Sequence, residues 1–436
     1  MTTDLLVEVR RGAYHDSIVL MLASRRMAQA GGVVAAMAAM ATELNLDMLR
    51  DAGLWSPELE SIGAEDLVLA ARGPDAKAGL EAAERALADH GHRSAGAGDS
   101  PRPRTLRTAA THLPGASLAV ISVPGAHAAW ACWDALAAGL NVFCFSDNVS
   151  VEDEIGLKDE ALRRGLLFMG PDCGTAILDG TGLGFSNALP RGSLGIVGAS
   201  GTGIQELGCL LAHQGVGVSQ AIGVGGRDLT PAVGGRMARE AVRRLDDDPG
   251  TELIVVVSKP SRVDAGLHAR KPLVNAMLGP HLDLTQVALS VGGGRLPSPP
   301  EPLAWDGPVA GIFSGGTLRD EAALIWAEAG DRFRAVDYGA DEYTRGRAHP
   351  MIDSTIRLEA IARAPGLVYL DVVLGRGAHP DPAAELAPAL NGRPAVVALI
   401  GVEADPQGLS RQRAVLEAAG AQVHLSNAQA ARSLLR

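Results

Sequence analysis

Short apolar runs alternate with longer amphipathic stretches through the first 90 residues. The runs have the length of β-strands and lie at residues 5–9, 33–40 and 66–71. The stretches between and after them place apolar residues at helical spacing, which predicts helices at residues 16–28, 41–54 and 75–88. This order predicts a small α+β domain over residues 1–90. Residues 91–104 lack apolar periodicity and are rich in Gly, Ser and Pro, so we expect a linker there.

From residue 105 the chain alternates strictly between a strand, a glycine turn and a helix. The predicted strands lie at residues 118–123, 141–145, 166–169, 194–197, 216–223 and 252–258. After a Pro-rich run at residues 296–308, the alternation resumes with strands at residues 309–313, 367–373, 395–400 and 422–425. Nearly continuous apolar strands of this kind are typical of parallel sheets covered on both faces. We therefore predict an α/β protein with three doubly wound units, Rossmann-like or flavodoxin-like, at residues 105–190, 191–304 and 305–436.

Two glycine-rich turns are candidates for an anion site. Each follows a predicted strand and precedes a predicted helix, where backbone N–H groups lack partners at the positive end of the helix dipole. The first turn contains Ser200, Gly201, Thr202 and Gly203, and the second contains Ser314, Gly315, Gly316 and Thr317. A single turn of this kind is explained equally well as a tight connection with a helix N-cap. Two such turns favour a phosphate enclosed from both sides.

Composition narrows the range of partners. The formal net charge is −11 and only 3% of residues are aromatic, whereas nucleic-acid binders need basic surfaces and often stacking side chains. The apolar runs are too short to span a bilayer, and the N-terminus has no basic region of a secretory signal. The four cysteines lie far apart, without zinc-ligand spacing. We expect a cytoplasmic protein that binds neither nucleic acid, membrane nor metal.

Charged and polar residues near predicted strand ends are further candidates. Arg227 and Lys259 can neutralise phosphate or carboxylate charge, although ordinary surface pairing also explains such residues. Asp147 and Asn148 can contact an amide, but residues of these types after a strand are also routine turn formers.

Cys173 and His349 each allow two interpretations. Cys173 follows Asp172 at a strand end and can reach a cleft, but no neighbouring histidine is evident, which favours a packed thiol. His349 can orient a substrate or shuttle a proton, or it can be a loop histidine capped by Asp353.

Parts of the chain resemble succinyl-CoA ligase. The segments VPGAHAAWACWDALAAGLNVF and GLLFMGPDCGTAI resemble the end of the CoA-binding domain of the α subunit, and residues 194–229 resemble its second domain. Residues 309–436 are similar to the C-terminal domain of the β subunit. The resemblance implies two helix N-termini that point at one phosphate. The loop for the CoA pyrophosphate, the ligase's phosphorylated-histidine segment and an ATP-grasp domain are missing; between residues 260 and 303 the histidines are His268 and His281.

The chain is identified as a member of the FdrA family from motifs along nearly its whole length. They include RRGAYHDSIVLM, FSDNVSVEDEI, MGPDCGT, GASGTGIQEL, GVGGRDL, VVSKP, SGGTL, HPMID and DVVLG. The resemblance implies a subunit of an oxamate carbamoyltransferase-like enzyme of allantoin catabolism, which needs no cofactor, works with other carbamoyltransferase subunits and can form a homo-oligomer. Its ligands would be carbamoyl phosphate, or phosphate, and a small amide such as oxamate.

In that mechanism the phosphate lies between the two glycine turns, and the catalytic candidates are Arg227, Lys259, His349, Asp147 and Asn148. Two alternatives stay open. The chain can be a subunit of a CoA- and nucleotide-dependent acyl ligase, or a non-catalytic scaffold that binds a phosphorylated metabolite.

Overall fold

The computed structural model describes residues 4–15, 17–91, 103–260, 266–344 and 347–435. The chain divides into two compact units. One comprises residues 1–102 with 345–348, and the other comprises residues 103–344 with 349–436. Most of the linker expected at residues 91–104 lies outside the described residues.

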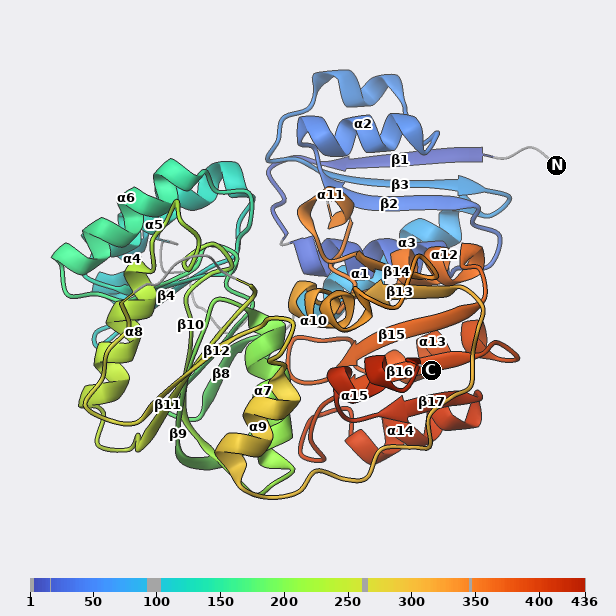
Figure 1. The fold of residues 1–436 in the computed structure, drawn as a ribbon. Coiled ribbons are helices and arrows are strands. Elements are labelled where there is room, and N and C mark those ends of the chain that lie inside the picture. The colour runs from blue at the N-terminus through green and yellow to red at the C-terminus, as the bar shows by residue number, and fades with distance from the viewer. Residues whose placement is uncertain (1–3, 16, 92–102, 261–265, 345–346, 436) are drawn as a thin grey trace. The chain divides into compact units, whose positions relative to one another are not determined.

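The N-terminal unit is a three-stranded antiparallel sheet in the order β1–β3–β2. Its strands are β1 (Asp4–Arg10), β2 (Ala35–Met40) and β3 (Leu67–Gly73). Residues alternate between two cores: Leu67 and Leu69 pack under helices α1 (Ser17–Ala28) and α3 (Ala76–Gly91), whereas Val68 packs with α2 (Glu43–Asp51) and the 3₁₀ turn η1 (Pro57–Ser61). The two sets of helices lie on opposite faces of this sheet in Figure 1.

The larger unit begins with a short parallel sheet in the order β4–β5–β6. It contains β4 (Leu118–Ile121), β5 (Asn141–Cys144) and β6 (Phe168–Met169), together with helices α4 (Leu106–His112), α5 (Gly125–Ala137) and α6 (Val151–Arg163). The residues near position 108, where a first Rossmann strand would lie, form helix α4. This part of the fold therefore has no strand-to-helix glycine turn ahead of β4 among the described residues.

A six-stranded sheet follows, in the order β12–β11–β9–β10–β7–β8. Its parallel strands are β9 (Arg191–Gly198), β10 (Val218–Gly223), β11 (Leu253–Ser258) and β12 (Leu273–Met277). Helices α7 (Gly201–Ala212) and α9 (Leu284–Gly292) pack on one face, and α8 (Arg236–Asp247) packs on the other.

The hairpin β7 (Thr175–Leu178) and β8 (Thr181–Gly184) joins this same sheet, because β7 pairs antiparallel with β10. The boundary expected at residue 190 therefore falls after two strands that already belong to the next sheet. Strands β7, β8 and β12 were not expected from the sequence, since they are short and lack a long apolar run.

The third sheet is parallel, with five strands in the order β14–β13–β15–β16–β17. Its strands are β13 (Val309–Phe313), β14 (Phe333–Asp337), β15 (Leu367–Val373), β16 (Ala395–Ile400) and β17 (Ala421–His424). Helices α10 (Gly316–Trp326) and α15 (Asn427–Arg432) cover one face, and the opposite face carries α12 (Thr355–Arg363), α13 (Pro382–Leu390) and α14 (Leu409–Ala418). The short helix α11 (Asp341–Thr344) follows β14.

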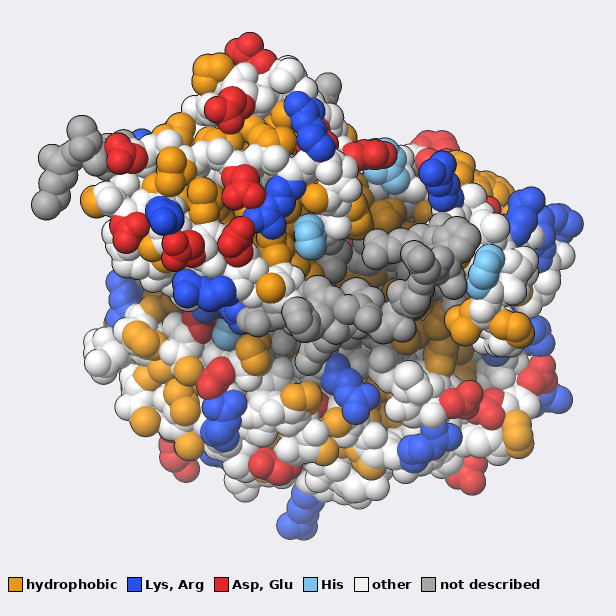
Figure 2. Space-filling view, turned by 180° about the vertical axis from the view of Figure 1, so that it is seen from behind, with side chains coloured by type: hydrophobic (Ala, Val, Ile, Leu, Met, Phe, Trp, Pro, Cys, Tyr) orange, Lys and Arg blue, Asp and Glu red, His pale blue; other side chains and the backbone are white. Residues whose placement is uncertain are grey.

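Helices from the second and third sheets meet face to face: α7 contacts α10, and α9 contacts α15. The predicted fold class, an α/β chain with doubly wound parallel units after a small N-terminal domain, is confirmed. Charged side chains of both signs intermingle on the face seen in Figure 2. None of the described helices is long and apolar enough to cross a membrane.

Candidate functional site

The N-termini of α7 and α10 meet, and this meeting brings the two glycine turns together. Ser200 is the N-cap of α7, where its Oγ accepts a hydrogen bond of 2.9 Å from the N–H of Gly203. The same Oγ lies 2.5 Å from Oγ1 of Thr317, in the first turn of α10. A Cβ placed on Gly315 would lie 2.7 Å from Cγ2 of Thr202, so glycine is needed for this close approach.

Several donors of the second turn are already used inside the protein. The buried carboxylate of Asp371, on β15, accepts hydrogen bonds from the N–H of Ser314 at 2.7 Å, from its hydroxyl at 3.0 Å and from the N–H of Gly315 at 2.8 Å. Burial raises the pKa of Asp371, while Arg357 and these hydrogen bonds oppose the rise. The expectation that Ser314 and Gly315 donate to a phosphate therefore conflicts with the structure, because an internal carboxylate occupies them.

The N–H groups that remain open belong to the first turns of the two helices. No described residue accepts a hydrogen bond from the N–H of Gly201, Thr202, Gly316 or Thr317. In addition, Oγ1 of the buried residue Thr175 lacks a hydrogen-bond partner and lies 3.1 Å from the position of a Cβ on Gly201.

Lys259 and Asp337 both reach the start of α10. A Cβ on Gly316 would lie 2.6 Å from Nζ of Lys259 and 2.7 Å from Oδ2 of Asp337. The Lys259 ammonium otherwise approaches Oδ2 of Asp320 at 3.9 Å. Asp337 ends β14, and its Oδ1 accepts a hydrogen bond from the N–H of Gly339 at 2.9 Å; burial raises its pKa. The sequence did not point to Asp337, since β14 itself was not expected.

His349 lies beside the same loop. Its Nδ1 accepts a hydrogen bond of 3.2 Å from the N–H of Met351, and its Nε2 lies 2.7 Å from the position of a Cβ on Gly339. Burial and the charge of Arg357 lower the pKa of His349 to about 4, so the ring is neutral at neutral pH and carries its hydrogen on Nε2. Asp353 accepts a hydrogen bond from the N–H of Thr355 at the start of α12, so its carboxylate caps that helix instead of the histidine.

A pocket of about 180 Å³ adjoins Lys259. Its lining is mostly small and apolar, from Ala199, Gly226, Leu229, Thr230, Pro231, Ser258, Lys259 and Pro260. Asp172 lies near this pocket, with Oδ2 3.3 Å from the position of a Cβ on Gly226. Part of Asp172 is exposed, but protein atoms crowd its carboxylate; this desolvation, with the charges of Asp341 and Asp147, raises its pKa to about 7.

The remaining candidates take structural positions. Cys173 is buried, its Sγ lies 3.6 Å from the carbonyl oxygen of Thr175, and burial raises the pKa of its thiol to about 12, so it is a packed thiol and not an activated nucleophile. Asn148 has a left-handed backbone with φ of 53°, and a Cβ on Gly125 would lie 2.4 Å from the carbonyl oxygen of Asp147. Asp147 and Asn148 thus form a tight turn against the start of α5.

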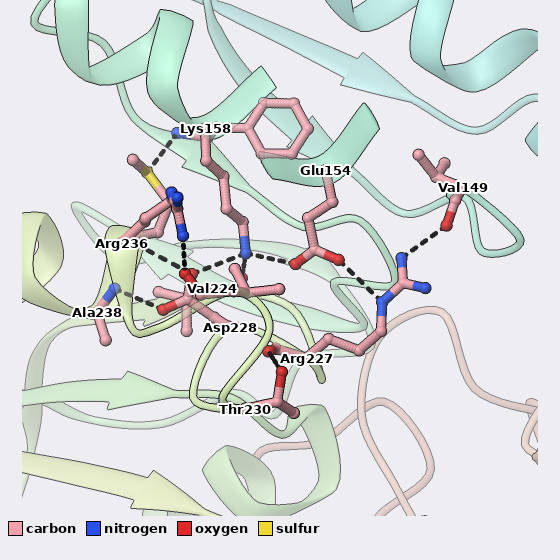
Figure 3. A network of polar contacts seen from close by, with 12 residues as sticks. Val149, Glu154, Lys158, Val224, Arg227, Asp228, Thr230, Arg236 and Ala238 are labelled. Carbon is pink, nitrogen blue, oxygen red and sulfur yellow. Dashed lines mark hydrogen bonds and ion pairs between the residues drawn. The ribbon is translucent and has the colours of Figure 1, made fainter. Parts of the chain in front are cut away.

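Arg227 belongs to a network of ion pairs and hydrogen bonds (Figure 3). The network holds the loop after β10, which lines the pocket, against α6. It donates to Oε2 of Glu154 at 2.8 Å and to the carbonyl of Val149 at 2.7 Å. The fully buried ammonium of Lys158 donates to Oε1 of Glu154 at 2.7 Å and to Oδ1 of Asp228 at 2.8 Å. Two cations therefore balance two carboxylates. The structure places the guanidinium of Arg227 in this network.

Two known families match the two ends of the chain. Residues 1–103 match the family described as AllF, heavy metal-associated domain, and residues 312–435 match the family described as CoA-ligase. YahF from Escherichia coli (strain K12) is 35% identical, and the match covers 95% of this chain and 95% of YahF. The chain belongs to the YahF family.

This YahF-family chain is also similar to CoA ligases over part of its length. The succinate–CoA ligase [ADP-forming] α subunit from Aquifex aeolicus (strain VF5) is 33% identical over 33% of this chain and 48% of that subunit. The match therefore spans about half of that relative. Among solved structures, ATP citrate lyase from Methanothrix soehngenii aligns with a TM-score of 0.35 at 16% identity, over 44% of this chain and 38% of that one.

These relatives correct the expected activity of the YahF-family chain. The carbamoyltransferase expectation is wrong, because the matching relatives of stated activity are CoA ligases and the C-terminal domain matches the CoA-ligase family. The name of the N-terminal family does not carry over as a metal site either. Residues 1–103 contain no cysteine, the thiolate ligand that soft metals prefer, and the described residues contain no group of three or more potential ligands.

Proposed function

We propose that this chain is a subunit of an acyl-CoA ligase-like enzyme and that it binds phosphate, or the phosphoryl group of an acyl phosphate, between α7 and α10. The observation that carries the proposal is the contact between Ser200 and Thr317, which brings two helix N-termini with open N–H groups to one place. The match of residues 312–435 to the CoA-ligase family supports the enzyme class.

Electrostatics favour a dianion at this point. Each helix N-terminus carries the equivalent of about half a positive charge, and two that converge act on the same ligand. Lys259 adds a full positive charge beside Gly316. Asp337 lies next to the ammonium, so Lys259 offsets its negative charge as well as that of the ligand. The ligand would therefore be held mainly by backbone N–H groups and one flexible cation.

The histidine near the site suits binding better than covalent catalysis. The Nδ1 lone pair of His349 is occupied by the N–H of Met351, and Nε2 carries the ring hydrogen. The ring can donate a hydrogen bond to a phosphoryl oxygen, but it offers no free lone pair for attack on phosphorus. We therefore propose a non-covalent role for His349.

The chemistry would be acyl transfer with phosphate as the leaving group. When a nucleophile from an acyl acceptor attacks the carbonyl carbon of an acyl phosphate, the bond between that carbon and the bridging oxygen breaks and its electron pair stays on the phosphate. Preorganised N–H groups stabilise this developing charge. The small, mostly apolar pocket beside Lys259 suits a short acyl group. A partner subunit would supply the nucleotide and the acceptor.

A melting experiment with inorganic phosphate tests the proposal. A ligand that binds only the folded state raises the melting temperature by mass action. We expect a concentration-dependent rise in wild type and a much smaller one in Lys259→Met. The matched control is Lys77→Met, which removes a lysine whose side chain is 79% exposed in the N-terminal unit and should leave the shift unchanged. The absence of a shift in wild type would refute phosphate binding.

A phosphometabolite-binding scaffold without turnover is the second candidate. It is favoured by the same two observations that speak against covalent catalysis: the buried thiol of Cys173 and the occupied Nδ1 of His349. One assay distinguishes the two functions: the chain is purified with its natural partners and incubated with acyl phosphates and CoA. Release of phosphate with formation of a thioester supports the enzyme, whereas binding without turnover supports the scaffold.

A further inference from the structure

Two buried glutamates connect the helices that carry the glycine turns. Glu206 lies on α7 and Glu321 lies on α10, and their exposed fractions are 0% and 2%. Asn427, at the start of α15, bridges them: its backbone N–H donates to Oε1 of Glu206 at 2.8 Å, and its Nδ2 donates to Oε2 of Glu321 at 2.7 Å. Oε1 of Glu321 accepts a hydrogen bond of 2.8 Å from the N–H of Leu284.

One oxygen of this arrangement has no partner. Oε2 of Glu206 is buried and forms no hydrogen bond with any described group. Tyr369, from β15, is directed to the backbone and side-chain oxygens of Asn427 and does not donate to either glutamate. An ionised carboxylate only accepts hydrogen bonds, so a buried carboxylate oxygen without a donor is costly.

The charged groups around Glu206 and Glu321 do not balance the negative charge of the two carboxylates. The acidic groups that face it are Asp283 at the N-terminus of α9 and Asp371 on β15. The basic group is Arg432 on α15, which hydrogen-bonds Asp283. Within the described part of the chain, no lysine or arginine forms an ion pair with Glu206 or Glu321. Two ionised carboxylates here would be close to one another without a counter-ion of their own.

We propose that Glu206 and Glu321 share one bound proton, and that this protonated pair is the positioning device that keeps α7 and α10 together so that their N-termini converge on one anion. A proton shared between the two carboxyl groups removes one of the two negative charges that burial makes costly. The claim that the pair positions the two helix N-termini for an anion rests on the proposed phosphate site. The claim that the pair shares a proton does not.

The acidity of the two groups agrees with this arrangement. Burial, followed by the charge of Glu321, raises the pKa of Glu206 well above its usual range, and burial raises the pKa of Glu321 to about 7. When the pair loses its proton at higher pH, two negative charges face each other between α7 and α10. The repulsion loosens the contact that brings the glycine turns together, so anion affinity falls as pH rises.

Difference infrared spectroscopy tests the shared proton without any ligand. The wild-type chain at pH 6 should show the C=O band of a protonated carboxylic acid that is missing from Glu206→Gln or from Glu321→Gln. The matched control is Glu240→Gln, a mostly buried glutamate that pairs with the more exposed Arg243 and Arg244, which should leave that band in place. If no glutamine variant of the pair folds, the band is followed in Asp172→Asn, which removes another carboxyl group whose pKa is about 7, and it should still disappear as pH rises. An identical band in wild type and both pair variants, or no band in wild type, overturns the proposal.

Calorimetry with sulfate tests the positioning step, because sulfate stays a dianion over the whole range. Wild type should lose about tenfold in affinity between pH 6 and pH 9, the factor that corresponds to one pKa unit. Glu206→Gln should lose less. Equal losses in wild type and variant contradict the positioning role. If sulfate does not bind at any pH while the infrared band behaves as expected, the proposed phosphate site is refuted and the shared proton stands.

Discussion

The larger unit buries carboxylates in two contrasting ways. In the network of Figure 3, Glu154 and Asp228 contact Lys158, and Arg227 completes the charge balance. In the Glu206–Glu321 pair, the hydrogen bonds come from backbone N–H groups and an asparagine, and no lysine or arginine among the described residues forms an ion pair with either glutamate. A balanced network depends on keeping all its charges, whereas an unbalanced pair depends on a proton. The first should therefore be insensitive to pH near neutrality, and the second should be sensitive.

The largest effect is expected when the balanced network loses its central cation. Lys158→Met leaves Glu154 and Asp228 buried with fewer partners, and breaking a buried ion pair typically costs about 3–5 kcal/mol of folding free energy. Denaturant unfolding of the full chain measures the loss. Lys77→Met, at an exposed position, should cost less than about 0.5 kcal/mol. A loss below about 1 kcal/mol for Lys158→Met would show that the network carries little stability.

The unbalanced pair, unlike the balanced network, should change its contribution to stability as pH changes. Burial raises the pKa values of Glu206 and Glu321 above their unfolded values, so between the unfolded and folded pKa values the folded state binds more protons than the unfolded state. Stability is then fully present below the unfolded pKa and is lost as pH rises through the folded pKa of the pair. One pKa unit corresponds to about 1.4 kcal/mol, so wild type should lose about 1–3 kcal/mol between pH 5 and pH 8. Glu321→Gln should reduce that slope in parallel denaturant titrations; an unchanged slope would assign it to other groups.

Gly316→Ala tests the anion site itself, at the start of α10. The new methyl group would meet Nζ of Lys259 and Oδ2 of Asp337 at less than 3 Å, and the flexible lysine would move aside. We expect phosphate affinity to fall about tenfold, or 1.4 kcal/mol, with little change in stability. Gly279→Ala is the control in the same unit, because a Cβ there has no neighbour within 4 Å. Calorimetry compares the two variants.

The two serines of the glycine turns should differ in which property their loss changes. Ser200→Ala removes the N-cap of α7 and the contact with Thr317, which should cost about 0.5–2 kcal/mol of stability. Ser314→Ala removes one donor to Asp371, so it should lower stability by about 1 kcal/mol and leave phosphate affinity nearly unchanged. A loss of affinity in Ser314→Ala would show that its hydroxyl contacts the anion after all. Thermal melts with and without phosphate separate these cases.

The sequence predicted most of the strands and the positions of the glycine turns. It did not predict that a carboxylate inside the protein already accepts the hydrogen bonds of the turn at Ser314. Strands such as β15 and β16 are uninterrupted apolar runs, and the glycine turns follow strands, so both were visible. Strand β14, with the sequence FRAVD, carries charged residues at its second and last positions and was missed, and Asp337 was missed with it. Asp371 reaches the turn at Ser314 only because β13 and β15 pair across more than fifty residues of sequence. Such contacts leave no local signal.

The glutamate pair was invisible for a similar reason. Glu206 and Glu321 lie on helices that cover different sheets, and each helix alone places its glutamate on an ordinary amphipathic surface. Burial arises only when α7 packs on α10. By contrast, the relation of Glu154 to Lys158 has the i, i+4 spacing of a helical ion pair, so part of the balanced network could have been predicted.

A crystal structure grown with inorganic phosphate would show directly whether the two helix N-termini bind an anion. We expect one phosphate within hydrogen-bond distance of the N–H groups at Thr202 and Thr317, with the ammonium of Lys259 turned toward it. A structure in which those N–H groups face only water at saturating phosphate, or in which the ion binds elsewhere, would contradict it.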